Sequence, residues 1–175
     1  MPSRYRVPAG WLLGVVVLVL ARPTLSSILL GLPLGFVGEA IRIWASGHIE
    51  KTKKLATGGP YAHARHPLYV GSVLLALGVG VASASVWVVV AVAVYFLAFF
   101  PAVMREESDF LARKFPEEFA AWAAEVPPFW PRVRPGGPRS SRFEWPRVSQ
   151  NREWRTALAI YAISAHVYAR QLLGY

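Results

Sequence analysis

The residues best suited to chemistry are concentrated in Gly58–Gly71. This stretch reads Gly-Gly-Pro-Tyr-Ala-His-Ala-Arg-His-Pro-Leu-Tyr-Val-Gly, and it combines phenol, imidazole and guanidinium groups at the start of the apolar run Val70–Ala82. Pro67 suits the first turn of a helix, because the N–H that proline lacks has no partner there. Arg65 and His66 are then expected just outside the helix N-terminus, where free N–H groups and the helix dipole favour an anionic or polar ligand. The alternative is that both residues extend toward lipid headgroups at a membrane surface.

Two further groups of charged residues are candidates for function. Glu39 and Arg42 are three positions apart near the end of an apolar run, so they share one face of a helix. Such a pair in a membrane helix faces the bundle interior or a wet cavity, and it is either functional or a structural ion pair. Glu106 and Glu107 form the second group, shortly after another apolar run.

The cysteine and histidine content excludes several kinds of site. The chain has no cysteine, which excludes disulfides, thiolate zinc sites and cysteine nucleophiles. No His-x-x-x-His or His-Glu-x-x-His pair occurs among its histidines, which are His48, His63, His66 and His166. We therefore expect no metal site.

The elements that must position these residues are apolar helices. Hydrophobic residues make up 54% of the chain and charged residues 17%, and the apolar ones form long runs. This composition predicts an all-α integral membrane protein with a single domain, 1–175. The runs predict five membrane-spanning helices, at about 7–21, 25–44, 67–83, 86–103 and 154–173. In the second run, Gly31, Gly35 and Gly38 allow either close helix packing or the close approach of a ligand.

The net charge of +9 would suit a nucleic-acid partner, but the positions of the charges favour a membrane. Nearly all Lys and Arg residues lie before the first run, near the base of the second, or in and beside the polar segments 46–66 and 104–150. The positive-inside rule places such segments in the cytosol. We therefore expect the lipid bilayer as a partner, no nucleic acid, and a cytosolic N-terminus.

Helices are also expected beyond the membrane. No helix breaker follows the fourth run until Pro116, so that helix should continue out of the bilayer. A second, amphipathic helix is predicted at 117–125. The stretch 129–150 is rich in Pro, Gly, Arg and Trp, and it is expected to be an interfacial loop without regular structure.

The two polar segments share one face, so we expect Glu106 and Glu107 to lie near Arg65 and His66. A cleft with carboxylates, a guanidinium, imidazoles and tyrosine rings suits a ligand that carries an anionic group, a cation and an aromatic ring. S-adenosylmethionine has all three. Carboxylates form charge-assisted bonds with its ammonium or ribose hydroxyls, and tyrosine rings stabilise its sulfonium by cation–π attraction.

The arrangement of these motifs resembles a known family. The pattern Gly-Pro-Tyr…Arg-His-Pro-x-Tyr-x-Gly, followed about 40 residues later by Glu-Glu…Phe…Glu-Glu-Phe…Trp…Val-Pro, resembles the isoprenylcysteine carboxyl methyltransferases. It is similar also to the wider group of integral membrane methyltransferases that includes the phospholipid methyltransferases. The resemblance covers roughly 35–131. It implies S-adenosylmethionine as cofactor, in a cytosol-facing pocket built from the inter-helix segments and helix extensions.

The resemblance also implies roles for individual residues. Tyr61 lines the cofactor site, 54–56 contributes backbone contacts, and Glu107 matches a cofactor-binding glutamate, with Glu106 as its equivalent after a one-residue slip. The residues implied to bind the cofactor are His48, Lys54, Leu55, Ala56, Tyr61, His66, Pro67, Leu68, Tyr69 and Glu107. The candidates for a catalytic role are Arg65, His66 and Glu106.

The methyl acceptor is only broadly indicated. Methyl transfer from a sulfonium is an in-line displacement that depends on proximity, orientation and a dry site. A base is needed only for a protonated nucleophile, and His66, Glu106 and Glu39 all remain open for that role. The prenylcysteine enzymes place an arginine where this chain has Val103, so a free carboxylate on the acceptor is not indicated. We expect a membrane-associated or small hydrophobic acceptor.

Two other functions fit parts of the pattern. Some membrane sterol or isoprenoid reductases that use NADPH have a region that resembles the same Arg-His-Pro-x-Tyr segment. A non-catalytic protein that binds lipid or a partner through its basic surface would also have this composition. The bias toward Ala, Val and Arg without cysteine favours a bacterial cytoplasmic membrane, with the active site facing the cytosol.

Overall fold

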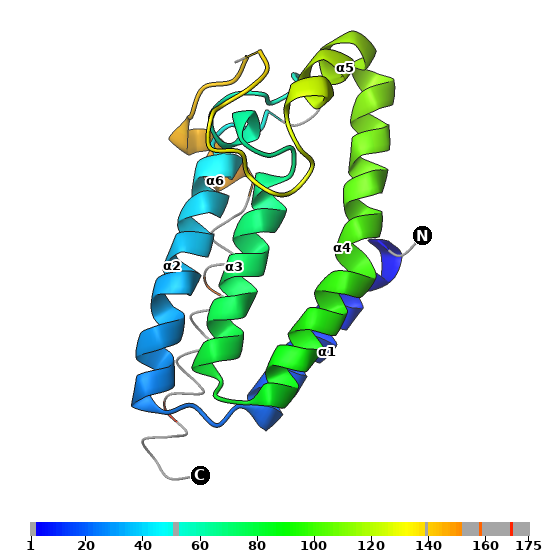
Figure 1. The fold of residues 1–175 in the computed structure, drawn as a ribbon. Helices are drawn as coiled ribbons and strands as arrows, with labels where there is room; N and C mark the ends of the chain where they lie inside the picture. Colours follow the sequence, from blue (N-terminus) through cyan, green and yellow to red (C-terminus); the bar gives the residue numbers. More distant parts are fainter. Residues whose placement is uncertain (1–2, 51–52, 139, 152–157, 159–168, 170–175) are drawn as a thin grey trace. The chain divides into compact units, whose positions relative to one another are not determined.

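The computed structural model describes residues 3–50, 53–138, 140–151, 158 and 169. These residues form helices and connecting segments and no strand, which confirms the all-α prediction (Figure 1). The helices are α1 (Ser3–Leu20), α2 (Leu25–Ser46), α3 (Pro67–Ala82), α4 (Val86–Lys114), α5 (Pro116–Glu125) and α6 (Trp145–Gln150), with a 3-10 turn at Gly59–Ala62.

The described residues fall into two compact units. The first contains described residues of Met1–Gly38 and Val73–Val103, and the second contains those of Glu39–Ser72 and Met104–Trp154. Helices α2, α3 and α4 contribute residues to both units. The candidate site residues all belong to the second unit.

The first unit buries a small aliphatic core and exposes much of its apolar surface. Val17 of α1 packs with Val88 and Val92 of α4 in this core. Elsewhere large apolar side chains point outward, such as Trp11, which is 75% exposed, and Leu97, which is 76% exposed. Exposed apolar surface on this scale is a liability in water and is favourable against lipid.

Helices α2 and α3 approach each other backbone to backbone in the first unit (Figure 1). A Cβ atom added to Gly31 would overlap the carbonyl oxygen of Gly78 and would lie 2.7 Å from the backbone nitrogen of Ala82. A Cβ added to Gly78 would lie 2.7 Å from the nitrogen of Gly35. Of the two roles open for the glycines of α2, the structure therefore assigns helix packing to Gly31, whereas a Cβ added to Gly35 would meet nothing within 4 Å.

The connections at one end of the first unit are closed by hydrogen bonds. Thr24 caps α2 reciprocally: its hydroxyl accepts from the Ser27 N–H at 3.1 Å, and its own N–H donates to the Ser27 hydroxyl at 2.9 Å. The Arg22 N–H donates to the Ser83 carbonyl at 2.8 Å. The bond from Arg22 to Ser83 joins the turn between α1 and α2 to the turn between α3 and α4.

In the part of the chain that the structure describes, two helices, α2 and α4, are long and apolar enough to cross a membrane. The other two predicted spans near the N-terminus and at 67–83 coincide with apolar helices that are shorter, Tyr5–Leu20 and Pro67–Ala82. Sixteen residues, the length of α3, rise about 24 Å in an α-helix, less than the ~30 Å of a typical hydrocarbon core. The predicted span at 154–173 lies almost wholly outside the described residues.

The second unit is organised around one buried tryptophan. Trp122 of α5 packs with Leu55, Tyr61 and Val126 in the core of this unit. Its indole N–H donates to the carbonyl of Tyr61 at 2.9 Å. The indole thus ties α5 to the 3-10 turn that precedes α3, and it satisfies a buried donor at the same time.

Predictions for the polar segments were confirmed in part. Helix α4 continues to Lys114, and α5 begins within one residue of the predicted amphipathic helix. The prediction of no regular structure over 129–150 was wrong at its end, because α6 occupies Trp145–Gln150. Pro146 stands in the first turn of α6, where proline is favoured. A helix of six residues has too few apolar positions to show a period.

Candidate functional site

Arg65 and His66 are held by backbone hydrogen bonds to the segment after α5. The Arg65 N–H donates to the carbonyl of Pro127 at 2.8 Å, and the His66 N–H donates to the carbonyl of Pro128 at 3.1 Å. The first N–H groups of α3 turn inward, since Tyr69 donates to the His66 carbonyl at 3.0 Å. The expected anion site of free N–H groups before α3 is therefore largely filled by protein. At Arg65 and His66, the side chains and not the backbone N–H groups are therefore available to a ligand.

The imidazole of His66 lies between a carboxylate and a hydroxyl. Its Nδ1 is 3.6 Å from Oε2 of Glu107, and its Nε2 is 3.0 Å from the hydroxyl oxygen of Ser108. The imidazole is 3% exposed, whereas the Glu107 side chain is 45% exposed. The ring of Tyr69 is tilted against the imidazole, with 5.5 Å between centroids. The structure thus brings together three of the residues assigned by resemblance, and it adds Ser108.

Arg65, which precedes His66 in the chain, is a partly buried cation. Its guanidinium lies over the ring of Phe119, 5.8 Å from the centroid. Burial lowers the pKa of Arg65 from its ordinary value, although arginine stays protonated at neutral pH. Its Nε is buried and makes no hydrogen bond to the described part of the chain. A planar cation with donor capacity left suits a carboxylate.

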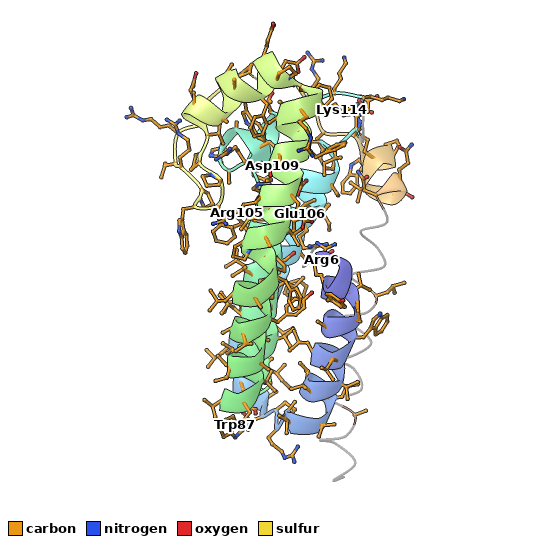
Figure 2. All side chains as sticks on the ribbon, turned by 90° about the vertical axis from the view of Figure 1, so that its right-hand side faces the viewer. Arg6, Trp87, Arg105, Glu106, Asp109 and Lys114 are labelled. Carbon is orange, nitrogen blue, oxygen red and sulfur yellow. The ribbon has the colours of Figure 1, made fainter. Side chains whose placement is uncertain are left out.

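Glu106 precedes Glu107 on α4 but is presented differently. Figure 2 shows Glu106 among the charged residues that follow one another along this part of the helix, with Arg105, Asp109 and Lys114. Its side chain is exposed. The carboxylate next to the imidazole is that of Glu107.

A separate cavity of about 200 Å³ lies elsewhere in the second unit. Four residues assigned to the cofactor by resemblance line it together with Glu50, and the rest of its lining comes from a later segment that the resemblance does not reach. The lining is His48, Glu50, Lys54, Leu55, Ala56, Ser140, Ser141, Arg142, Glu144 and Arg147. We call 140–147 the strap segment.

Hydrogen bonds fasten the strap segment to the chain before α3. The Ser140 hydroxyl donates to the carbonyl of Leu55 at 2.8 Å, and the Ser140 N–H donates to the hydroxyl of Thr57 at 3.0 Å. The Gly58 N–H donates to the hydroxyl of Ser141 at 2.9 Å. Hydrogen bonds that involve serine and threonine hydroxyls therefore join two segments that are more than 80 residues apart in the sequence.

An ion-pair bridge forms part of the cavity wall. Nη2 of Arg147 is 2.9 Å from a carboxylate oxygen of Glu144 and 3.3 Å from one of Glu50. Because one cation serves two anions, the carboxylates keep lone pairs for further donors. Such a wall suits hydroxyl or ammonium groups of a ligand.

His48 is fixed against the glycine that opens the 3-10 turn. Its Nδ1 is 2.9 Å from the carbonyl of Trp44, so Nδ1 carries the proton when the ring is neutral. A Cβ added to Gly59 would overlap the His48 ring, and Gly59 has a φ of +57°. Both the contact and the backbone conformation require glycine at this position.

Several of the remaining predicted residues are buried in or near the core of the second unit. Tyr61 is in the buried core, and Leu68 packs against it. Pro67 is buried at the start of α3. His66, Tyr69 and Glu107 are not among the described residues that line the cavity. The structure therefore gathers His66, Tyr69 and Glu107, with Ser108, into one group that we call the His66 cluster. It places His48, Lys54, Leu55 and Ala56 around the cavity.

Glu39 and Arg42 form the ion pair that their spacing indicates. Nε of Arg42 is 3.9 Å from the Glu39 carboxylate, and both side chains are largely buried. The guanidinium of Arg42 also donates to the hydroxyl of Ser72 on α3. The pair thus links α2 to α3 within the second unit.

The sequence gives no pattern from which Ser108 or the strap segment could be predicted to take part in a site. Ser108 follows two acids that attract attention, but a lone serine on a polar helix face has no distinguishing pattern. The strap segment has the composition of a solvated loop, and nothing local shows that it pairs with residues before α3. Only long-range contacts identify both.

Comparison with known proteins gives a family match and two relatives. A family model described as phospholipid methyltransferase matches residues 26–118. The cobalt-zinc-cadmium resistance protein CzcN of Cupriavidus metallidurans is 43% identical over 107 residues, which are 60% of this chain and 48% of CzcN. The nickel-cobalt-cadmium resistance protein NccN of Alcaligenes xylosoxydans xylosoxydans is 37% identical over a stretch of the same length. The chain spans about half the length of these relatives. No solved structure matches it.

Proposed function

Because this chain belongs to the phospholipid methyltransferase family, we propose that it transfers a methyl group from S-adenosylmethionine to a membrane-associated or small hydrophobic acceptor. The matched residues 26–118 contain the whole His66 cluster. The observation that carries the proposal is the contact between His66 and Glu107, 3.6 Å apart, because it joins the two family motifs at one place.

The groups of the His66 cluster suit the charges of this cofactor. The half-exposed carboxylate of Glu107 can accept from an ammonium or from ribose hydroxyls. The ring of Tyr69 can face a sulfonium, which is attracted to the π-electrons of an aromatic ring. The partly buried guanidinium of Arg65 is suited to the carboxylate. Bound in such a site, S-adenosylmethionine supplies an electrophilic methyl group.

The cavity at the strap segment suits one end of the same cofactor. Its volume of about 200 Å³ is below the usual 300–1,000 Å³ of pockets that enclose a whole ligand. The backbone at 54–56 and the carboxylates of Glu50 and Glu144 offer acceptors for hydroxyl and amine groups. We assign this cavity to cofactor contacts that the chain makes outside the His66 cluster.

The setting in the cell follows from composition and helices. The chain is a membrane protein, with α2 and α4 long enough to cross a bilayer. We propose a bacterial cytoplasmic membrane, with the segments 46–66 and 104–150 in the cytosol, because these segments are rich in Lys and Arg. The cofactor is water-soluble and cytosolic, whereas the acceptor reaches the protein through lipid.

Ligand-induced stabilisation tests the cofactor assignment. S-adenosylmethionine or S-adenosylhomocysteine should raise the unfolding temperature of the detergent-solubilised protein, because a ligand that binds only the native state stabilises it by about 2.7 kcal/mol at 100 times its Kd. NADPH should not. A shift with NADPH and none with S-adenosylhomocysteine would favour the reductase reading, and no shift with either would favour a non-catalytic protein.

A further inference from the structure

The surroundings of His66 determine which of its nitrogens carries the proton. Glu107 presents only acceptor oxygens toward Nδ1, at 3.6 Å, which is beyond hydrogen-bond length. The nearby negative charge favours the neutral tautomer with its proton on Nδ1, and we take this tautomer as the premise of the inference below. Nε2 is then an acceptor. In this tautomer the hydroxyl of Ser108, 3.0 Å from Nε2, donates its hydrogen to that nitrogen. The three groups therefore follow one another in space as the Glu107 carboxylate, the His66 imidazole and the Ser108 hydroxyl.

This order leaves the Ser108 oxygen able to receive a second hydrogen. A serine hydroxyl has one donor hydrogen and two acceptor lone pairs, and the donor is used by His66. Ser108 is only half-buried, whereas His66 is almost completely buried. A substrate can therefore reach the hydroxyl more readily than the imidazole. Ser108 is positioned to act between an incoming acceptor and the base.

We propose that Ser108 and His66 form a proton relay for the methyl acceptor, and that the acceptor is a protic nucleophile such as a thiol, an amine or an alcohol. The inference rests on the proposed methyl transfer, and it goes further by naming the acceptor class and the base. A carboxylate acceptor is already deprotonated at neutral pH and would have no use for the relay.

The relay balances the reaction. A bond forms between the acceptor heteroatom and the methyl carbon as the bond from that carbon to the sulfonium sulfur breaks. The electron pair of the broken bond stays on sulfur, which becomes a neutral thioether. The acceptor's proton passes to the Ser108 oxygen while the serine hydrogen passes to Nε2 of His66. The resulting imidazolium lies next to the Glu107 carboxylate and afterwards returns its proton to water.

The test compares acceptor classes in the whole detergent-solubilised protein. Labelled S-adenosylmethionine is supplied with dodecanethiol, dodecylamine or dodecanoate, and the wild type is measured beside Ser108→Ala and Ser108→Thr. Ser149→Ala, an exposed serine on α6, is the matched control. Ser108→Ala should lower kcat with the thiol or amine by roughly 100-fold, the lower range for acid–base catalysis. Ser108→Thr keeps the hydroxyl and should keep most of the rate, and Ser149→Ala should match the wild type.

The outcomes separate this inference from the proposed function. A wild type that binds labelled S-adenosylmethionine but methylates only dodecanoate would overturn the inference and leave methyl transfer standing. Equal losses for protic and carboxylate acceptors, or no loss, would also overturn it. A wild type that retains no S-adenosylmethionine would refute the proposed function itself.

A second measurement does not depend on finding the acceptor. In protein labelled with 15N-histidine, the His66 signals should show a proton on Nδ1 and none on Nε2, assigned by their loss in His66→Gln. Ser108→Ala should shift the Nε2 signal, and Ser149→Ala should not. A proton on Nε2 of the wild type, or an Nε2 signal indifferent to Ser108→Ala, would contradict the relay.

Discussion

The acidic pair on α4 shows how one position on a helix decides a role. Neighbouring residues on a helix leave it about 100° apart, so Glu106 and Glu107 cannot face the same partner equally. The carboxylate that approaches His66 is that of Glu107. The sequence pattern alone leaves the two glutamates nearly equivalent, because a slip of one residue changes the face of the helix and not the motif.

Replacing Glu107 tests the assignment of that carboxylate. Glu107→Gln should weaken binding of S-adenosylmethionine by about 1.5–3 kcal/mol, the range for a hydrogen bond to a charged group. Isothermal titration of the purified protein would measure it. Glu117→Gln, an exposed residue in the first turn of α5, is the control and should change the affinity little. Equal effects of the two substitutions would place the cofactor elsewhere.

The contact between α2 and α3 depends on the absence of side chains. Gly31→Ala should destabilise the protein by roughly 1–3 kcal/mol, the usual cost of overpacking, because its Cβ meets the backbone of α3. Gly14→Ala on α1 has open space around the new Cβ. It should stabilise the helix by about 0.5–1 kcal/mol, since glycine is unfavourable inside helices. Thermal unfolding of both variants in the same detergent should show a lower unfolding temperature for Gly31→Ala and a higher one for Gly14→Ala. Changes of the same sign would contradict this packing.

At the scale of elements, prediction succeeded where runs were long. The apolar runs and the proline at position 116 give α1 to α5 to within a few residues, because helix periodicity and helix breakers are local properties. Residues Trp145–Gln150 are too few for that signal. The cavity could not be predicted either, because the pairing of Ser140 with Leu55 depends on the folded chain and not on either segment alone.

The whole molecule has a feature that makes its orientation in the membrane easy to test: it lacks cysteine. Single-cysteine variants can therefore be labelled without background. Val133→Cys, at a 93% exposed position of the second unit, should react with a membrane-impermeant maleimide in inside-out vesicles. Trp87→Cys, 67% exposed at the start of α4, should react in right-side-out vesicles. Labelling of both from the same side would contradict the proposed cytosolic location of 104–150.

The contacts of the strap segment can form only late in the synthesis of the chain. Thr57 and Ser140, whose hydroxyls are 2.9 Å apart in the finished protein, are separated by 83 positions. A ribosome adds roughly 5–20 residues per second, so about 4–17 s pass between the emergence of the two. During that interval the carbonyl of Leu55 and the N–H of Gly58 must be satisfied by water or by a chaperone. The cavity can therefore form only after residues 140–147 have been made, and a shorter nascent chain can bind no ligand there.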